Sequence, residues 1–258
     1  MADRVYPVTK SVKELPGDPS ELYLQYTSAH GLIEDLHGET LQRWEVFVRH
    51  GEPDDRRLEP DSSDATSAGE GDSPSAAHGS GAGRMVFYRI RLDQGMNAWQ
   101  AMEEESEDLS EIARVLLDED TGNYTPEASE RLAYAGTDLL VMDRVVLAPL
   151  WRGFGVGAIL AAEAVHRLVP GCRGVACVPG ISEPDESWRP DRAEWDRVKN
   201  RITKSWERVG FNHYRETVYL LDPATVVPEE QRTLLRADYA QMCMDWRENT
   251  TSTCASEQ

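Results

Sequence analysis

The pattern of hydrophobic and polar residues predicts a chain built around short strands. Short apolar runs bounded by Gly, Pro or polar residues are typical of strands. They lie at 21–33, 43–50, 85–92, 138–148, 173–178 and 214–221. The run at 138–148 is rich in Val and Leu and ends before Pro149, so we expect it to be a buried strand.

Three further segments have the three- and four-residue spacing of amphipathic helices. They are 97–117, 195–209 and 229–246. Their apolar faces are formed in turn by Leu109, Ile112, Ala113, Leu116 and Leu117, by Trp195, Val198, Ile202, Trp206 and Val209, and by Leu235, Tyr239, Met242 and Trp246. We expect the last face to pack on the domain. A dimer contact or a lid over a substrate site is the alternative.

Two segments lack the apolar side chains that a packed structure needs. Residues 51–84 are rich in Gly, Ser, Ala, Asp and Pro, which predicts a disordered acidic insertion between two strands of one domain. The last dozen residues are also predicted to be disordered. We therefore expect one domain over 1–222 and a C-terminal extension over 223–258, with a helix followed by a tail.

The most informative segment is 141–160, where the predicted strand runs into a glycine-rich loop and then an Ala/Leu-rich helix. Gly153, Gly155 and Gly157 alternate directly before this helix. Glycines at this spacing let a tight loop direct its backbone N–H groups to one point, and the helix N-terminus adds partial positive charge. With Arg152 at the rim, the loop predicts a pyrophosphate-binding site.

Two common phosphate-binding motifs do not fit this loop. A Walker A loop would end in Gly-Lys-Ser/Thr, and that triplet is missing from the sequence. A dinucleotide-binding fingerprint has the spacing G-x-G-x-x-G near the start of its domain, whereas the spacing here is G-x-G-x-G in the second half of the chain.

The loop does resemble motif A of the GNAT acetyltransferases, R/Q-x-x-G-x-G/A, through Arg152, Gly155 and Gly157. A second resemblance lies at 199–211, a helix that carries Asn200 and ends at Gly210-Phe211 before a strand. The resemblance covers about 138–221. It implies a mixed α/β (α+β) fold with a mostly antiparallel central sheet flanked by helices, although here the strands precede the helices in the N-terminal half.

The resemblance also implies acetyl-CoA as the acyl donor and a set of residues that bind it. In this family a bulge in the motif A strand exposes backbone groups to the pantetheine arm, which by position falls on Val145 to Leu147. The implied cofactor-binding residues are Val145, Val146, Leu147, Arg152, Gly153, Phe154, Gly155, Val156, Gly157, Ala158 and Asn200.

Acetyl transfer needs a base for the amine and a proton donor for the departing thiolate. Asp143 and Asp138 precede the loop and lie five residues apart, so they point to opposite faces of the strand. We prefer Asp143 as the base, with a structural ion pair to an arginine as the alternative. The family's usual Tyr aligns with Trp206, which has no suitable proton, and Tyr214 is the better proton donor by chemistry.

Composition restricts the partners. With 46 acidic and 27 basic residues the formal charge is −19, which opposes binding to nucleic acid and suits a small cationic amine or a basic peptide. An acidic loop at 182–195 is a candidate substrate rim, with Glu183, Asp185, Glu186 and Trp188.

The four cysteines have no metal-site spacing, so we expect no metal. We also expect a cytoplasmic protein with no membrane segment, and a homodimer is left open.

The sequence therefore predicts an acetyl-CoA-dependent N-acetyltransferase that moves an acetyl group to a primary amine by direct attack in a ternary complex. A catalytically degenerate GNAT domain that binds acyl-CoA as a sensor or interaction module is the alternative, because Trp206 replaces the usual proton donor.

Overall fold

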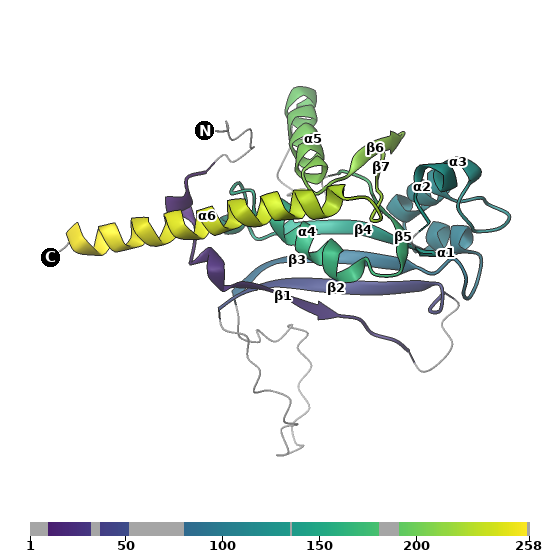
Figure 1. The fold of residues 1–258 in the computed structure, drawn as a ribbon, viewed down its shortest axis with the longest axis horizontal. Coiled ribbons are helices and arrows are strands. Elements are labelled where there is room, and N and C mark those ends of the chain that lie inside the picture. The colour runs from purple at the N-terminus through teal and green to yellow at the C-terminus, as the bar shows by residue number, and fades with distance from the viewer. Residues whose placement is uncertain (1–9, 32–36, 52–79, 135, 181–190, 257–258) are drawn as a thin grey trace, which may run out of the picture.

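A seven-stranded sheet in the order β1-β2-β3-β4-β5-β7-β6 forms the centre of the computed structural model (Figure 1). The structure describes residues 10–31, 37–51, 80–134, 136–180 and 191–256. Neighbouring strands are antiparallel except for β4 and β5, which are parallel. The strands are β1 (Leu22–Thr27), β2 (Leu41–His50), β3 (Ser80–Ile90), β4 (Asp138–Leu147), β5 (Cys172–Cys177), β6 (Asn212–Arg215) and β7 (Val218–Leu221). The predicted mixed, mostly antiparallel sheet is confirmed.

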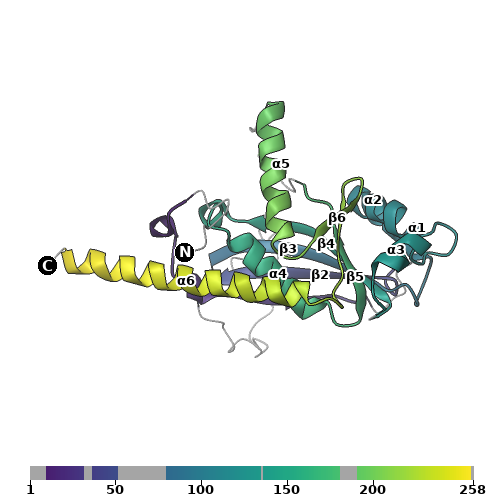
Figure 2. The same cartoon turned by 45° about the horizontal axis from the view of Figure 1, so that its top comes forward.

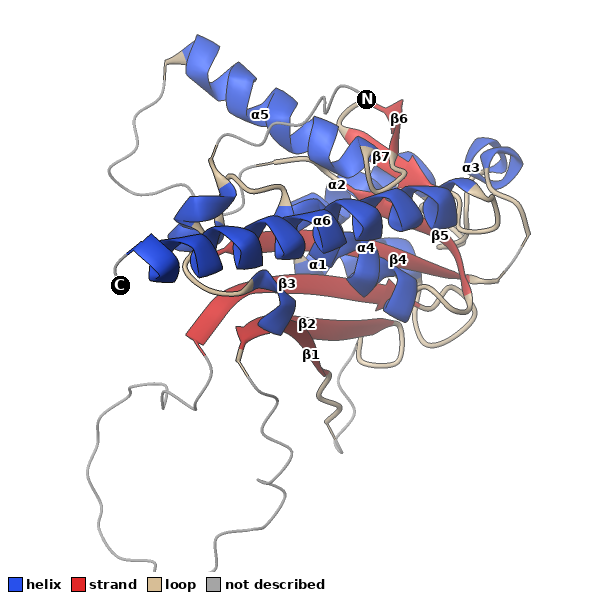
Figure 3. Cartoon of the chain, turned by 60° about the vertical axis from the view of Figure 1, so that its left-hand side comes forward, coloured by secondary structure: helices blue, strands red, loops and turns tan. Residues whose placement is uncertain are grey.

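Helices cover both faces of this sheet (Figures 1 and 3). One face packs against α4 and α6, and the other packs against α1 and α2 at one end of the sheet. The α-helices are α1 (Ala98–Glu105), α2 (Glu107–Leu116), α3 (Pro126–Arg131), α4 (Val156–Leu168), α5 (Arg192–Glu207) and α6 (Val227–Ser256). Short 3-10 turns are η1 (Val12–Glu14), η2 (Pro19–Glu21) and η3 (Pro149–Trp151).

Strand β4 separates the two hydrophobic cores because its side chains alternate between the two faces of the sheet. Leu140 and Met142 belong to the core under α4 and α6, whereas Leu139 and Val141 belong to the core under α1 and α2. Burial on both faces explains why this segment has an almost continuous apolar sequence.

Helix α6 packs on the domain, as its apolar stripe predicts. Leu235 is buried in the core and Tyr239, Met242 and Trp246 pack against it. The helix continues to Ser256, so the prediction of disorder is wrong for 247–256, whereas 257–258 lie outside the described residues. Extending a helix whose packed part has already formed costs little free energy per residue. The hydroxyls of Thr250 and Thr251 also donate hydrogen bonds to carbonyls one turn back in the helix.

Several predicted boundaries also change. The run 214–221 is a hairpin rather than one strand, because Glu216 adopts a positive φ of 50° and the chain turns there between β6 and β7. Strand β3 begins at Ser80 and takes the last part of the predicted insertion, whose residues 52–79 lie outside the described ones. The helix expected at 97–117 is divided at Ser106, whose side chain caps α2.

Helix α5 projects from the body of the molecule (Figure 2). None of its residues is buried, and Trp195 near its start is 42% exposed. Only its C-terminal half, with Ile202 and Trp206, reaches the sheet region where β4 and β5 separate. The predicted helix is present, but its apolar stripe is only half-covered.

Candidate functional site

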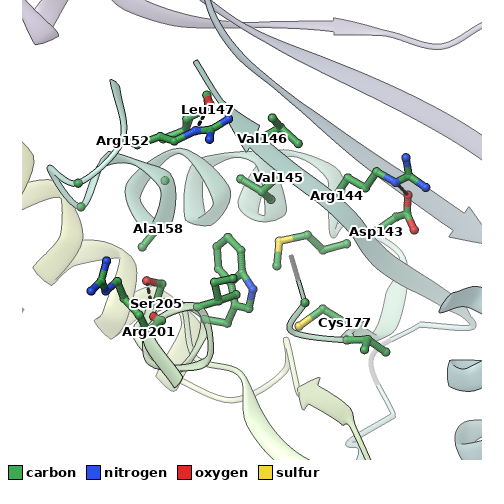
Figure 4. Close-up of a pocket in the computed structure, with 18 residues that line it drawn as sticks. Asp143, Arg144, Val145, Val146, Leu147, Arg152, Ala158, Cys177, Arg201 and Ser205 are labelled. Carbon is green, nitrogen blue, oxygen red and sulfur yellow. Dashed lines mark hydrogen bonds and ion pairs between the residues drawn. The ribbon is translucent and has the colours of Figure 1, made fainter. Parts of the chain in front are cut away.

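A cleft of about 330 Å³ opens where β4 and β5 diverge. The last β4–β5 pair is Val141 with Ala176, after which β4 continues to Leu147 without β5 beside it. The walls are β4 from Met142 onward, the glycine loop with the start of α4, the end of β5 and one side of α5 (Figure 4). The volume is at the lower end of the range for small-molecule sites.

The β4 wall is a free strand edge. From Met142 to Leu147 the only described strand that pairs with β4 is β3, on the opposite edge. Backbone N–H and C=O groups that do not face β3 are therefore directed at the cleft. Such an edge can bind an extended ligand that contains amide groups, in the manner of an added strand.

A bulge interrupts the β3–β4 ladder at Asp143. Phe87 pairs with Met142 and Val86 pairs with Arg144, so Asp143 has no partner on β3. The expected irregularity at Val145 to Leu147 is wrong in position, since these residues pair in register with β3. The bulge instead places Asp143 and Arg144 on the same face of the sheet, where they form an ion pair of 3.4 Å.

The glycine loop leaves the N-terminus of α4 open. Gly153 and Gly155 have φ of 93° and 80°, a conformation that other residues adopt at a cost. Gly155 is the N-cap, no side chain caps the helix, and the first turn carries no acidic residue. The first N–H groups of α4 therefore remain without an intrahelical partner and favour an anion.

Arginines border this end of the cleft from two sides. The Nε of Arg152 donates to the carbonyl of Leu147 at 2.6 Å, which folds the side chain back over the loop. Arg201 lines the cleft from α5 (Figure 4). Both side chains belong to exposed residues, and together with the helix N-terminus they make this end of the cleft positive.

The other end of the cleft is apolar. Met142, Cys177, Val178 and Trp206 line it. Burial raises the pKa of the Cys177 thiol, so this side chain stays neutral and is a poor nucleophile. An acyl chain or a thioester fits such surroundings better than a charged group does.

Asp143 lies at this apolar end. Its side chain is only 7% exposed, and burial raises its pKa above the ordinary value of 3.8. Arg144 and Arg43 lower this pKa, whereas Asp108 and Glu105 on the neighbouring helices reinforce the increase. A carboxyl with a raised pKa beside a cleft is a candidate acid–base residue. The alternative ion pair with an arginine is present as well.

The structure separates Trp206, which stands at the family's tyrosine position, from Tyr214, the candidate proton donor. Trp206 lines the cleft. Tyr214 is not among the residues that line it and packs against the core under α1 and α2. Its hydroxyl oxygen is buried and has no hydrogen-bond partner among the described residues. A proton-donor role for Tyr214 stays a prediction.

The other predicted site residues fall into four groups. Val145, Val146, Leu147, Arg152, Gly153, Gly155, Gly157 and Ala158 all line the cleft. Phe154 and Val156 are buried in the core and do not line the cleft. Asn200 is exposed on α5 and does not line the cleft. The rim residues Glu183, Asp185, Glu186 and Trp188 lie outside the described residues.

Sequence reasoning placed Trp206 at the family's tyrosine position but missed the rest of the α5 wall. Arg201, Ile202, Ser205 and Trp206 line the cleft together. Their spacing of one, four and five residues places them on one side of a helix, which is a signal that the sequence does contain. It also missed Met142 and Cys177, because nothing in the sequence shows where β5 stops pairing with β4.

Comparison with protein-family models, with curated proteins and with solved structures gives no match. Within the described ranges, no cluster of three or more His, Cys, Asp or Glu side chains could hold a metal ion. No helix in the described part of the chain is both long and apolar enough to cross a membrane.

Proposed function

We propose that the protein is an acetyl-CoA-dependent N-acetyltransferase of the GNAT type. The observation that carries this proposal is the construction of the cleft. One end has an uncapped helix N-terminus and two arginines, the middle is a free strand edge, and the far end is apolar with the Asp143 carboxyl beside it. A ligand that is anionic at one end, amide-rich in the middle and apolar at the other end fits this order.

Acetyl-CoA has these properties in the same sequence. Its pyrophosphate oxygens would accept hydrogen bonds from the N–H groups at the start of α4 and from Arg152, since both favour anions. Its pantetheine arm carries amides that suit the β4 edge. From Leu147 to Asp143 this edge spans about 13 Å, at about 3.3 Å per residue. The thioester would then lie at the apolar end.

The proposed reaction is direct acyl transfer. A neutral amine attacks the thioester carbonyl, a C–N bond forms and the C–S bond breaks. The proton lost by the amine passes to the Asp143 carboxylate, directly or through water, and the departing thiolate takes up a proton from solvent. Backbone N–H groups on the free edge of β4 would stabilise the oxyanion.

The acceptor that we propose is a small cationic amine or a basic peptide. Asp108 and Glu105 lie within electrostatic range of Asp143, and the whole chain carries a charge of −19. Negative charge of this kind attracts ammonium groups toward the bulge on β4.

A second candidate is an acyl-CoA-binding domain without turnover. The observation in its favour is that Trp206 lines the apolar end, whereas Tyr214 does not line the cleft. In this case the donor binds, but no side chain among the cleft residues of α5 protonates the thiolate.

Two experiments in sequence test the proposal. Isothermal titration of acetyl-CoA into the full chain should give saturable binding, and the lack of binding would reject both candidates. Thiol release is then followed with a panel of polyamines, aminoglycosides and basic peptides. Turnover that Asp143→Asn reduces at least tenfold, at unchanged acetyl-CoA affinity, is expected of the transferase. Binding without turnover on any amine favours the sensor.

A further inference from the structure

Lys10 lies against the glycine loop although it is far from the loop in sequence. Its backbone N–H donates to the carbonyl of Gly153 at 3.4 Å. Its ammonium group lies 5.5 Å from the centroid of the Phe154 ring. The ammonium group therefore lies beside the loop that leads into α4. It contacts Phe154, which does not line the cleft.

The segment after Lys10 is firmly attached, which fixes where its side chain emerges. Ser11 and Glu14 form a reciprocal capping box around η1. Leu15 is buried in the core, and η1 packs against α6. Further on, Arg247 of α6 bonds to Ser20 at 2.8 Å. Residues 10–20 thus form an N-terminal strap that is anchored to the domain, and this strap holds Lys10 at the loop.

Three cations from three separate elements border the start of α4. They are Lys10 from the N-terminal segment, Arg152 from the loop and Arg201 from α5. Within the described residues none of the three forms an ion pair with a carboxylate, in a chain with a charge of −19. Three cations that have no carboxylate partner in the described part of the chain exceed what a single pyrophosphate requires and point to a ligand with an additional phosphate.

We propose that Lys10 binds a phosphate group at the mouth of the cleft and gives the protein a preference for a donor that carries a phosphate beyond the pyrophosphate. This inference rests on the proposed function. The flexible four-carbon stem of a lysine lets the ammonium leave the Phe154 ring and reach an anion just outside the cleft. Coenzyme A has such a phosphate on its ribose, and dephospho-coenzyme A does not.

Titration calorimetry of both compounds into wild type, Lys10→Ala and Lys13→Ala tests the proposal. Lys13 lies on the same strap and serves as the matched control. For Lys10→Ala we expect about tenfold weaker binding of coenzyme A and nearly unchanged binding of dephospho-coenzyme A, since an exposed charge-assisted contact is lost. Lys13→Ala should bind both compounds as wild type does, and Lys10→Arg should restore most of the affinity.

Each other outcome overturns the inference in a distinct way. Equal affinity of Lys10→Ala and wild type for coenzyme A rejects a binding role for Lys10 and leaves the proposed function intact. An equal loss for both compounds rejects the preference for the additional phosphate. If wild type binds neither compound, the proposed function fails together with the inference. An unchanged Tm of each variant in thermal melting would exclude a loss of folding as the cause of weaker binding.

Discussion

Gly157 offers a substitution whose effects on stability and on binding have opposite signs. It lies in the first turn of α4 and lines the cleft. A Cβ added there would lie 3.6 Å from the Cδ1 of Leu147, which is an ordinary van der Waals contact. The folded protein therefore accepts Gly157→Ala without strain.

The magnitudes follow from helix propensity and from hydrogen bonding. Replacing a helical glycine by alanine stabilises by about 0.5–1 kcal/mol, which raises the Tm of a chain of this size by about 1–4 °C. The methyl group would occupy the cleft wall where the proposed pyrophosphate approaches the N–H groups of α4. Losing one charge-assisted hydrogen bond costs about 1.5–3 kcal/mol, so the Kd for acetyl-CoA should rise about tenfold to a hundredfold.

Gly171 provides the control at the opposite end of α4. It has a φ of 87°, and a Cβ there would meet nothing within 4 Å. Gly171→Ala should lower stability by about 1–2 kcal/mol through backbone strain alone. The cleft lies about 20 Å away along a helix of 13 residues, at 1.5 Å per residue, so the affinity should not change.

Differential scanning calorimetry and isothermal titration of the two variants measure both effects. The expected pair is a more stable variant that binds weakly and a less stable variant that binds normally. A Gly157→Ala protein with the wild-type Kd would refute the placement of the phosphates on the start of α4. If both variants lose stability and affinity together, the loss of affinity results from the lower stability and not from a change in the cleft wall.

Three further outcomes are expected. The raised pKa of Asp143 means that the native state holds this proton more tightly than the unfolded state, so wild-type stability falls as pH rises from 3.8 through that pKa. Asp143→Asn should therefore gain stability relative to wild type between pH 3 and pH 7 in urea titrations. Hydrogen bonds from Arg236 and Arg232 outweigh burial and lower the pKa of Glu163, so its contribution is complete above 4.5 and is lost as pH falls through the lowered pKa. Glu163→Gln should reduce the free energy of unfolding by about 1–3 kcal/mol at pH 7 and by less in acid. Arg201→Ala should weaken acetyl-CoA binding about tenfold by calorimetry, while Arg197→Ala one turn away should not.

Each of these expectations has a clear contrary result. A stability difference for Asp143→Asn that does not vary with pH would show that its carboxyl titrates alike in both states. If Glu163→Gln has the same free energy of unfolding as wild type at pH 7, the ion pairs of Glu163 do not stabilise the contact between α4 and α6. Equal losses of affinity for the Arg201 and Arg197 variants would indicate a general charge effect of α5.

The central part of the site follows from local sequence, and this is why it could be predicted. The strand, the alternating glycines and the helix are adjacent in the chain, and Arg152 through Ala158 are arranged by their own backbone preferences. The burial of Leu140 and Val141 on opposite faces also follows from alternation within one strand.

The remaining features depend on contacts between distant segments. The bulge at Asp143 results from the register between β3 and β4. No residue type in the strand indicates this register. The turn at Glu216 lacks Gly, Asn and Pro, so it gives no turn signal. The position of Lys10 at the loop depends on how the N-terminal segment packs against α6. The apolar stripe of α5 predicts a helix but not how much of it the domain covers.

Hydrogen–deuterium exchange with and without acetyl-CoA tests the central claim most directly, because it locates the ligand along the chain. The account predicts slower exchange in two separate segments, the backbone amides of 153–158 at the start of α4 and those of 142–147 on the free edge of β4. It also predicts unchanged exchange in α1 and in the outer part of α6. Saturating acetyl-CoA that leaves both segments unprotected, or that protects only residues outside the cleft, would contradict it.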